Sequence, residues 1–261
     1  MREIRYEVAD GVATLTIDRP EKRNAMTYAM LAEFEAGVRR ASDDPDVRAL
    51  VVTGAPGAFC AGIDLADLAA RSPDDRGRVD REDGAADRRG LLLLNCAKPV
   101  IAAVDGPAVG MGAEFTVQAD LRIASTGAKF AWNFGRRGLV SDTGAGSWLL
   151  PRQIGVQAAL RLLFTGETLD ADGARALGYV LDVVEPDALP DAARALAAAT
   201  AACSPFASAR TKRLVYDGLG NDLDAHVGAT RTALAECFAS ADHAEGVNAF
   251  LQRRPPHFTG T

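Results

Sequence analysis

Residues 98–114 read KPVIAAVDGPAVGMGAE, and this stretch decides the fold. Pro99–Val104 is a short apolar run, typical of a strand that is buried on both faces of a parallel sheet. A glycine-rich turn follows, and a helix is expected near Gly112–Ala119. The first N–H groups of such a helix have no partner within it and lie at its positive end. The stretch therefore predicts a strand, a loop and a helix start that presents backbone donors.

A second junction of this kind lies earlier in the chain. Arg48–Thr53 is another buried strand, and residues 58–65, AFCAGIDL, form a loop rich in small residues. The two units resemble each other, as successive turns of a coiled stack would. One glycine loop alone is a weak signal, because an ordinary tight turn has the same composition. Two such loops facing one pocket would hold an oxygen atom that gains negative charge, which is often the largest single contribution to catalysis.

The remaining sequence predicts a parallel α/β core followed by helices. Glu3–Val8 and Val12–Asp18 alternate apolar and polar residues around Asp10-Gly11, which predicts a hairpin. Thr27 is the expected N-cap of a helix, and Leu121–Ser125 is a third buried strand. Further helices, rich in Ala, Leu and Arg, are expected over Val156–Thr165, Pro186–Ala201, Ser204–Gly218 and Leu223–Ala239. Strands and helices that alternate in this way favour a sheet with covering helices.

Composition narrows the classes of function. The chain has 261 residues with 48% apolar content, which is enough for one substantial core. Its formal charge of −6 argues against a broad nucleic-acid-binding or membrane-surface face. The 4 cysteines are scattered, which fits neither a disulfide framework nor a zinc site and favours a cytoplasmic location. No apolar run reaches the roughly 18 residues of a membrane span, and we expect no signal peptide.

Six stretches, in this order, resemble the crotonase (enoyl-CoA hydratase/isomerase) superfamily: 17–26 IDRPEKRNAM, 58–65 AFCAGIDL, 98–114 KPVIAAVDGPAVGMGAE, 118–125 QADLRIAS, 138–155 GLVSDTGAGSWLLPRQIG and 162–184 LLFTGETLDADGARALGYVLDVV. The resemblance implies an α/β fold built as a spiral of ββα repeats, with a C-terminal helical trimerisation region. Residues 1–200 would form the spiral core with the acyl-CoA site, and residues 201–261 the helical region. The resemblance also implies acyl-CoA thioester substrates and a homotrimer or dimer of trimers.

The resemblance further implies which residues form the site. The backbone N–H groups of Ile63 and Met111 would form an oxyanion hole, and Glu114 matches the first of the two catalytic glutamates of enoyl-CoA hydratases. Without the resemblance, Glu114 would be explained as an acidic residue favoured by a helix dipole. The positions expected to bind the acyl-CoA are Lys22, Arg23, Ala61, Gly62, Asp64, Leu65, Gly110, Gly112, Phe134, Phe250 and Arg253.

Two pairs of these expected acyl-CoA-binding residues also have explanations that involve no ligand. Lys22 and Arg23 suit the phosphates of coenzyme A, but a solvated surface pair looks the same in sequence. Phe250 and Arg253 match a patch that often completes the CoA site from a neighbouring subunit, and an amphipathic terminal helix would also explain them. Ser72–Arg89, dense in Asp, Arg and Gly, is expected to be a mobile surface loop or frayed helix beside the acyl pocket.

The second glutamate of the hydratases is absent from this sequence. Its position, four residues before Gly138, is occupied by Phe134, which can neither orient water nor transfer a proton. Asp142, four residues after Gly138, matches an acid or nucleophile of some crotonase relatives. Asp-Thr-Gly is also ordinary turn chemistry, so Asp142 is either catalytic or a turn residue.

These observations leave two classes of function. The first is an enoyl-CoA isomerase or hydratase that uses Glu114, Asp142 and the two backbone donors. Isomerisation is favoured over hydration, because one carboxylate can move a proton between two carbons, and burial in an apolar pocket raises a carboxyl pKa to suit that task. The second is an acyl-CoA-binding paralogue with little or no catalysis, suggested by Phe134. No metal, flavin or nicotinamide requirement is visible, and coenzyme A would be part of the substrate.

Overall fold

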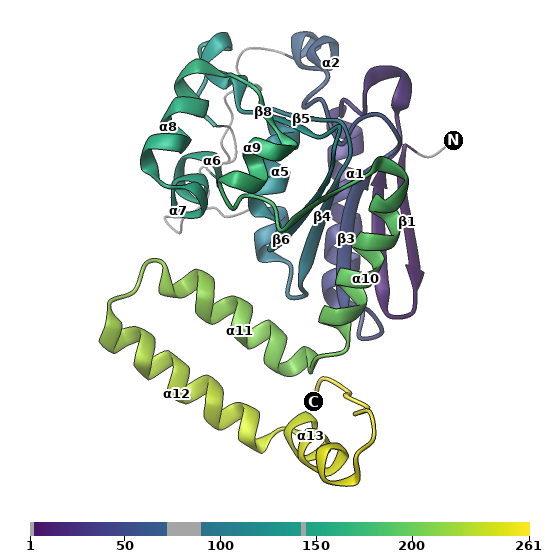
Figure 1. Ribbon diagram of the computed structural model, residues 1–261, viewed down its shortest axis with the longest axis vertical. Helices are drawn as coiled ribbons and strands as arrows, with labels where there is room; N and C mark the ends of the chain where they lie inside the picture. The colour runs from purple at the N-terminus through teal and green to yellow at the C-terminus, as the bar shows by residue number, and fades with distance from the viewer. Residues whose placement is uncertain (1–2, 72–89, 142–144) are drawn as a thin grey trace.

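The computed structural model describes residues 3–71, 90–141 and 145–261. Its main sheet has six strands in the order β1-β2-β3-β4-β6-β9 (Figure 1). The first pair is antiparallel and every other pair is parallel. The strands are β1 Ile4–Ala9, β2 Val12–Ile17, β3 Ala49–Gly54, β4 Val100–Val104, β6 Leu121–Ser125 and β9 Asp182–Val184. Asp10 and Gly11 join the hairpin with φ of 50° and 74°, the left-handed turn that the Asp-Gly pair predicts.

A second, smaller layer of strands runs beside the main sheet. It contains β5 Pro107–Val109, β7 Lys129–Ala131 and β8 Leu169–Asp170. Two isolated bridges, Met26 with Ile63 and Cys60 with Ala108, extend the same pattern through the earlier loops. Successive turns of the chain therefore contribute a long strand to one layer, a short strand or bridge to the other, and then a helix. This is the expected spiral of ββα repeats.

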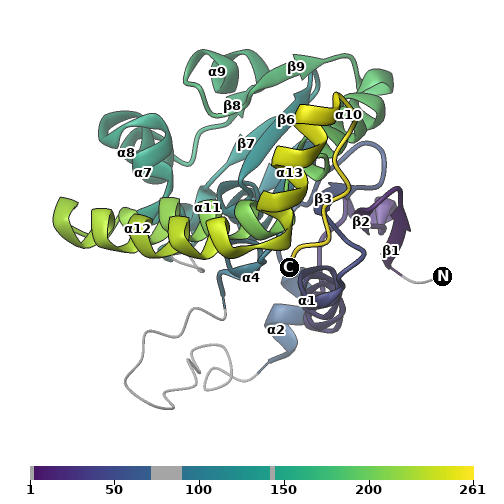
Figure 2. The same ribbon diagram turned by 90° about the horizontal axis from the view of Figure 1, so that it is seen from below.

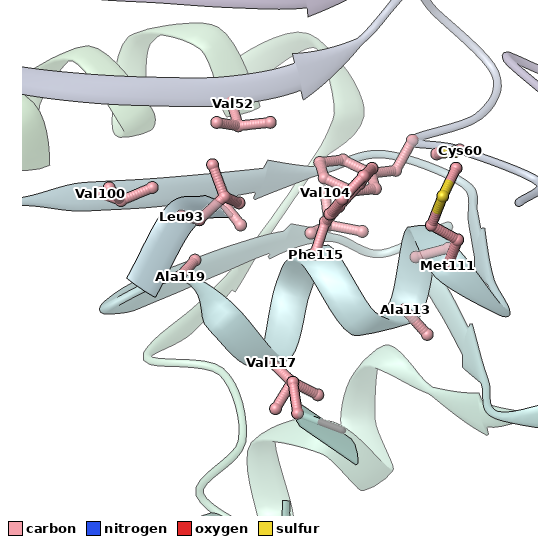
Figure 3. Close-up of a cluster of buried hydrophobic side chains, with 14 of the residues drawn as sticks. Val52, Cys60, Leu93, Val100, Val104, Met111, Ala113, Phe115, Val117 and Ala119 are labelled. Atoms are coloured by element: carbon pink, nitrogen blue, oxygen red, sulfur yellow. The ribbon is translucent and has the colours of Figure 1, made fainter. Parts of the chain in front are cut away.

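The main sheet is covered on both faces, which explains why its strands read as continuous apolar runs. In β4, Val100, Ala102 and Val104 belong to the core cluster that includes helix α1 (Tyr28–Asp43) and helix α5 (Met111–Gln118). Ile101 and Ala103 belong to a separate cluster with helix α10 (Leu189–Ala201). Figure 3 shows side chains of α5, including Phe115, gathered with Val104 in the first cluster.

The other helices are α2 Leu65–Ala70, α4 Leu92–Asn95, α6 Ala145–Trp148, α7 Leu150–Ile154, α8 Val156–Thr165, α9 Ala171–Ala176, α11 Pro205–Gly218, α12 Leu223–Ala239 and α13 Ala241–Gln252, with 3-10 turns at Pro20–Lys22, Asn133–Arg137 and Pro186–Ala188. Helices α11 to α13 follow the sheet region and extend along one side of it (Figures 1 and 2). Lys212 on α11 ties this arm to the sheet, since its ammonium lies 2.8 Å from the Asp120 carboxylate. Among the described helices, none has both the length and the apolar character needed to cross a bilayer.

Most expected elements are present, with small shifts at their ends. Thr27 accepts a hydrogen bond from the Met30 N–H as the N-cap of α1. Helices α8 and α12 have the expected bounds, whereas α5 begins at Met111 rather than near Gly112. The short strands β5, β7, β8 and β9 and helix α9 were not predicted as elements, whereas α13 is the terminal helix given as one explanation of Phe250 and Arg253. Ser72–Arg89, expected to be a loop or frayed helix, lies outside the described residues.

Candidate active site

The first candidate donor is the backbone N–H of Met111, the first residue of α5. Gly110 precedes it with φ 55° and ψ −120°, a conformation suited to glycine. The Gly110 N–H donates to the Ala131 carbonyl, and its own carbonyl accepts from the Glu114 N–H. Within the described residues no acceptor bonds the Met111 N–H, as is usual for the first turn of a helix. This N–H is therefore available to a ligand.

The second candidate donor is the backbone N–H of Ile63, one residue before the N-cap of α2. The Met26 N–H donates to the Gly62 carbonyl at 2.9 Å, and the Asp64 N–H donates to the Met26 carbonyl at 2.8 Å. This parallel bridge uses the groups on either side of Ile63, so the N–H of Ile63 itself points away from Met26. No hydrogen bond to it occurs in the part of the chain that the structure describes.

The two loops that carry these donors are packed directly against each other. A Cβ placed on Gly62 would lie 2.9 Å from the Val109 carbonyl oxygen and 3.7 Å from the Met111 nitrogen. A Cβ on Gly112 would lie 2.2 Å from the Cys60 carbonyl oxygen, which no real side chain could do. Gly62 and Gly112 are therefore required for loop–loop packing, a reason that sequence analysis did not give. Figure 3 shows Cys60 and Met111 side by side at this junction.

Glu114 lies in the first turn of α5 and is fully buried. Its Oε2 atom accepts a hydrogen bond of 2.9 Å from the backbone N–H of Gly146, in α6. A Cβ on Gly146 would lie 2.1 Å from Glu114 Oε1 and 2.6 Å from Ser141 Oγ. A glycine at 146 therefore lets the Glu114 carboxylate pack directly against the backbone of α6.

The far end of α5 is fixed by a buried arginine. The Arg122 guanidinium donates to the carbonyls of Thr116 and Ala119 at 3.0 and 2.6 Å, and to that of Tyr179 at 2.7 Å. It thereby satisfies carbonyls at the end of the helix that the helix itself leaves unpaired, and places a positive charge at its negative end. The Tyr179 and Thr116 hydroxyls are hydrogen-bonded at 2.7 Å. These contacts fix the position of α5 along its axis, and with it the positions of Met111 and Glu114.

The expected CoA-binding residues of the first two loops also come together. The Arg23 carbonyl accepts a hydrogen bond from the Ala61 N–H at 3.0 Å, so exposed Lys22 and Arg23 lie beside that loop. Asp64 caps α2 and bonds Arg19 at 2.8 Å; the hydrogen bond from Arg19 is the main reason that the pKa of Asp64 is lowered. The side chain of Asp64 thus stabilises the loop, while Leu65 beside it is exposed.

Phe134 lies near the donor loops, whereas Phe250 and Arg253 lie far from those loops in the same chain. A Cβ on Gly110 would be 3.9 Å from Phe134 Cζ, and Phe134 is buried. Phe250, on α13, is 83% exposed, and Arg253 is the C-cap of that helix. Figure 1 places α13 at the opposite end of the molecule from α2. Their expected role from a neighbouring subunit stays a prediction. Asp142 lies outside the described residues.

Asn24 is a supporting residue that sequence analysis missed. It is fully buried with φ 56°, and its amide donates to the carbonyls of Ala55 and Ala58 at 3.0 and 2.6 Å. Its side-chain oxygen accepts from the Arg19 N–H at 2.8 Å. Asn24 therefore joins the segment before α1 to the loop that leads to Ile63. The one signal available in the sequence was an asparagine in the turn-like stretch at residues 23–25, because asparagine tolerates the left-handed conformation.

Comparison with known proteins points to one family. The family model described as enoyl-CoA hydratase/isomerase matches residues 7–261. A probable enoyl-CoA hydratase of Rhodobacter capsulatus is 40% identical, with 98% of each chain covered. The 1,2-epoxyphenylacetyl-CoA isomerase of Escherichia coli is 37% identical over 100% of this chain and 99% of its own. A crystal structure of an enoyl-CoA hydratase from Mycobacterium marinum superposes with a TM-score of 0.88 at 37% identity and covers 99% of both chains. The chain therefore belongs to the enoyl-CoA hydratase/isomerase (crotonase) family.

Proposed function

We propose that this enzyme moves the double bond of an enoyl-CoA thioester, with the thioester oxygen bound by the N–H groups of Ile63 and Met111. The observation that supports this most directly is the packing of two donor loops against each other beside one buried carboxylate, Glu114. Donors fixed by the backbone need no reorganisation when charge develops on the oxygen, which makes such a pair effective.

Glu114 acts as the proton shuttle. Its carboxylate takes a proton from C2 of a 3-enoyl thioester, and the electron pair spreads over the dienolate to the thioester oxygen. The protonated Glu114 then returns the proton at C4, which leaves the 2-enoyl thioester. The step is neutral overall and consumes no water. The hydrogen bond from the Gly146 N–H keeps one carboxylate oxygen in place during this transfer.

The apolar residue at 134 favours isomerisation over hydration. Hydratases of this family share the handling of water between two carboxylates, and Phe134 replaces the second one. Phe134 is buried near Gly110, so it forms an apolar wall rather than a water-binding group. Asp142 is the candidate for a second acid. We also propose that the reaction uses no metal or separate cofactor, since coenzyme A arrives with the substrate.

The test is a rate assay on purified protein with 3-enoyl-CoA and 2-enoyl-CoA substrates of several chain lengths. Glu114→Gln is expected to reduce isomerisation by at least about 100-fold, because the amide cannot accept the proton. Glu7→Gln, on the exposed face of β1, is the matched control and should leave the rate unchanged. An unchanged rate in Glu114→Gln would remove Glu114 from the mechanism. Tight thioester binding with no turnover of either substrate would favour the binding paralogue instead.

We propose further that the chain assembles as a homotrimer or dimer of trimers, with Phe250 and Arg253 reaching a neighbour's CoA site. The exposure of apolar residues on the C-terminal arm supports this, and they include Leu223, Phe238, Phe250 and Leu251. Large exposed apolar side chains that gather on one part of a surface usually mark an interface. Sedimentation at several protein concentrations tests the assembly, and a monomer at all concentrations would exclude it.

A further inference from the structure

Ser141 is a buried polar residue that the proposed reaction does not use. It lies just after the 3-10 turn that carries Phe134, and only 9% of it is exposed. Its hydroxyl has no hydrogen-bond partner among the described residues. A buried hydroxyl without a partner is unfavourable, and nearly all such groups in folded proteins are satisfied by protein or by a bound molecule. The Ser141 hydroxyl is therefore a candidate to bind a molecule from outside the chain.

The position of the Ser141 hydroxyl relative to Glu114 follows from the contacts of Gly146. The point that a Cβ on Gly146 would occupy is 2.6 Å from Ser141 Oγ and 2.1 Å from Glu114 Oε1. Both oxygens therefore lie close together against the backbone of Gly146, an approach that any side chain at residue 146 would block. Ser141 thus provides a neutral donor and acceptor directly beside the carboxylate.

We propose that Ser141 binds an oxygen atom next to the Glu114 carboxylate, supplied either by a water molecule or by an oxygen substituent on the acyl chain. A purely hydrocarbon acyl group would leave the hydroxyl unpaired, whereas an acyl hydroxyl or a water would satisfy it. The inference deepens the proposed function, because it depends on Glu114 facing the reacting part of the acyl group. It makes Ser141 a specificity residue for oxygen-bearing acyl-CoA substrates.

If Ser141 binds a water molecule, the enzyme could hydrate a 2-enoyl thioester with Glu114 as its one carboxylate. Water held by Ser141 gives a proton to Glu114 as its oxygen bonds to C3 of a 2-enoyl thioester. Glu114 then passes that proton to C2, and the product is the 3-hydroxyacyl thioester. Both hydrogens and the oxygen of the water end in the product, so no further reactant is required.

The first experiment measures binding by titration calorimetry. Butyryl-CoA is compared with 2-, 3- and 4-hydroxybutyryl-CoA in the native protein, in Ser141→Ala and in the control Ser208→Ala on α11. If the acyl chain supplies the oxygen, one hydroxylated ligand binds the native protein about tenfold more tightly than butyryl-CoA, as one good hydrogen bond allows. Ser141→Ala should remove that preference, and Ser208→Ala should keep it. Ser141→Cys, which preserves shape but donates weakly, should behave as Ser141→Ala and replaces it if the alanine variant does not fold.

The second experiment measures rates and identifies the water source. Ser141→Ala should lower hydration of 2-butenoyl-CoA about tenfold more than it lowers isomerisation of a 3-enoyl-CoA, whereas Ser208→Ala should leave both rates unchanged. A variant that keeps the native hydroxyacyl preference and the native hydration rate would overturn the proposal, as would an equal loss of both activities. Failure of the proposed function is distinct: Glu114→Gln would then isomerise at the native rate, whatever the ligand preference at Ser141.

Discussion

Gly112→Ala tests whether loop packing sets the geometry of the two backbone donors. The added Cβ would lie 2.2 Å from the Cys60 carbonyl oxygen and 2.8 Å from the Cys60 Cβ, both buried. Ordinary contact begins at 3.4 Å, so the Cys60 carbonyl or the start of α5 must move by about 1.2 Å. That carbonyl accepts the Val109 N–H, which joins the two loops, so the movement strains the junction itself.

The expected magnitudes follow from this displacement. Forcing an extra carbon into a well-packed core costs about 1–3 kcal/mol of unfolding free energy. A displacement of about 1 Å in a catalytic group lowers a rate by on the order of 100-fold. Three quantities are measured: the free energy of unfolding in urea, kcat for isomerisation, and the shift to longer wavelength that a conjugated thioester shows when its bound carbonyl is polarised. Gly112→Ala should reduce all three.

The matched control is Gly228→Ala on α12. A Cβ there meets nothing within 4 Å, and the substitution removes a glycine from an exposed helix. Stability should rise by up to about 1 kcal/mol, with the rate unchanged. If Gly112→Ala kept native stability, rate and spectral shift, the argument that glycine packing positions the donors would be refuted.

Three further predictions concern other buried or paired groups. Asn24→Ala leaves two buried carbonyls without a donor and should lower the unfolding free energy by about 2–4 kcal/mol in urea titrations; a loss below about 0.5 kcal/mol would contradict this. Burial raises the pKa of the Cys60 thiol to about 12, so a thiol reagent at pH 8 should modify exposed Cys203 and reach Cys60 only on unfolding, as peptide mass mapping would reveal. The hydrogen bonds from Arg254 lower the pKa of Glu245 from 4.5 to about 2; stability from this pair is present above about pH 4.5 and is lost as the pH falls towards 2. Glu245→Gln should flatten that part of the stability–pH curve, and an unchanged slope would exclude the pair as its cause.

The elements that sequence analysis placed correctly have strong local signals. Helix α8 is bounded by Gly155 and Gly166, which both adopt positive φ, and its expected ends match the structure. Strand β4 is a run of five buried residues with no polar position. The short strands β5, β7 and β8 are different, because two or three residues become a strand only through pairing with distant segments.

Some features of the candidate site can likewise be predicted from local sequence, and others cannot. The glycine loops around Ile63 and Met111 were found because their strand–loop–helix pattern is local and matches a known family. The carbonyl partners of Asn24 and the proximity of Ser141 to Glu114 were not found, because they depend on residues more than 25 positions apart meeting in the fold. Sequence pattern thus predicted the donors, and the structure was needed for the groups that hold and surround their loops.

The position of α10 has a consequence for how this chain is made on the ribosome. Among the described residues, one face of the main sheet, formed by residues from Val12 to Ile123, packs against α10, which begins at Leu189. Until that helix leaves the exit tunnel, the nascent sheet exposes an apolar face with no internal cover. Slow synthesis between these regions therefore prolongs an aggregation-prone intermediate, and a chain truncated before α10 would depend on chaperones to remain dispersed.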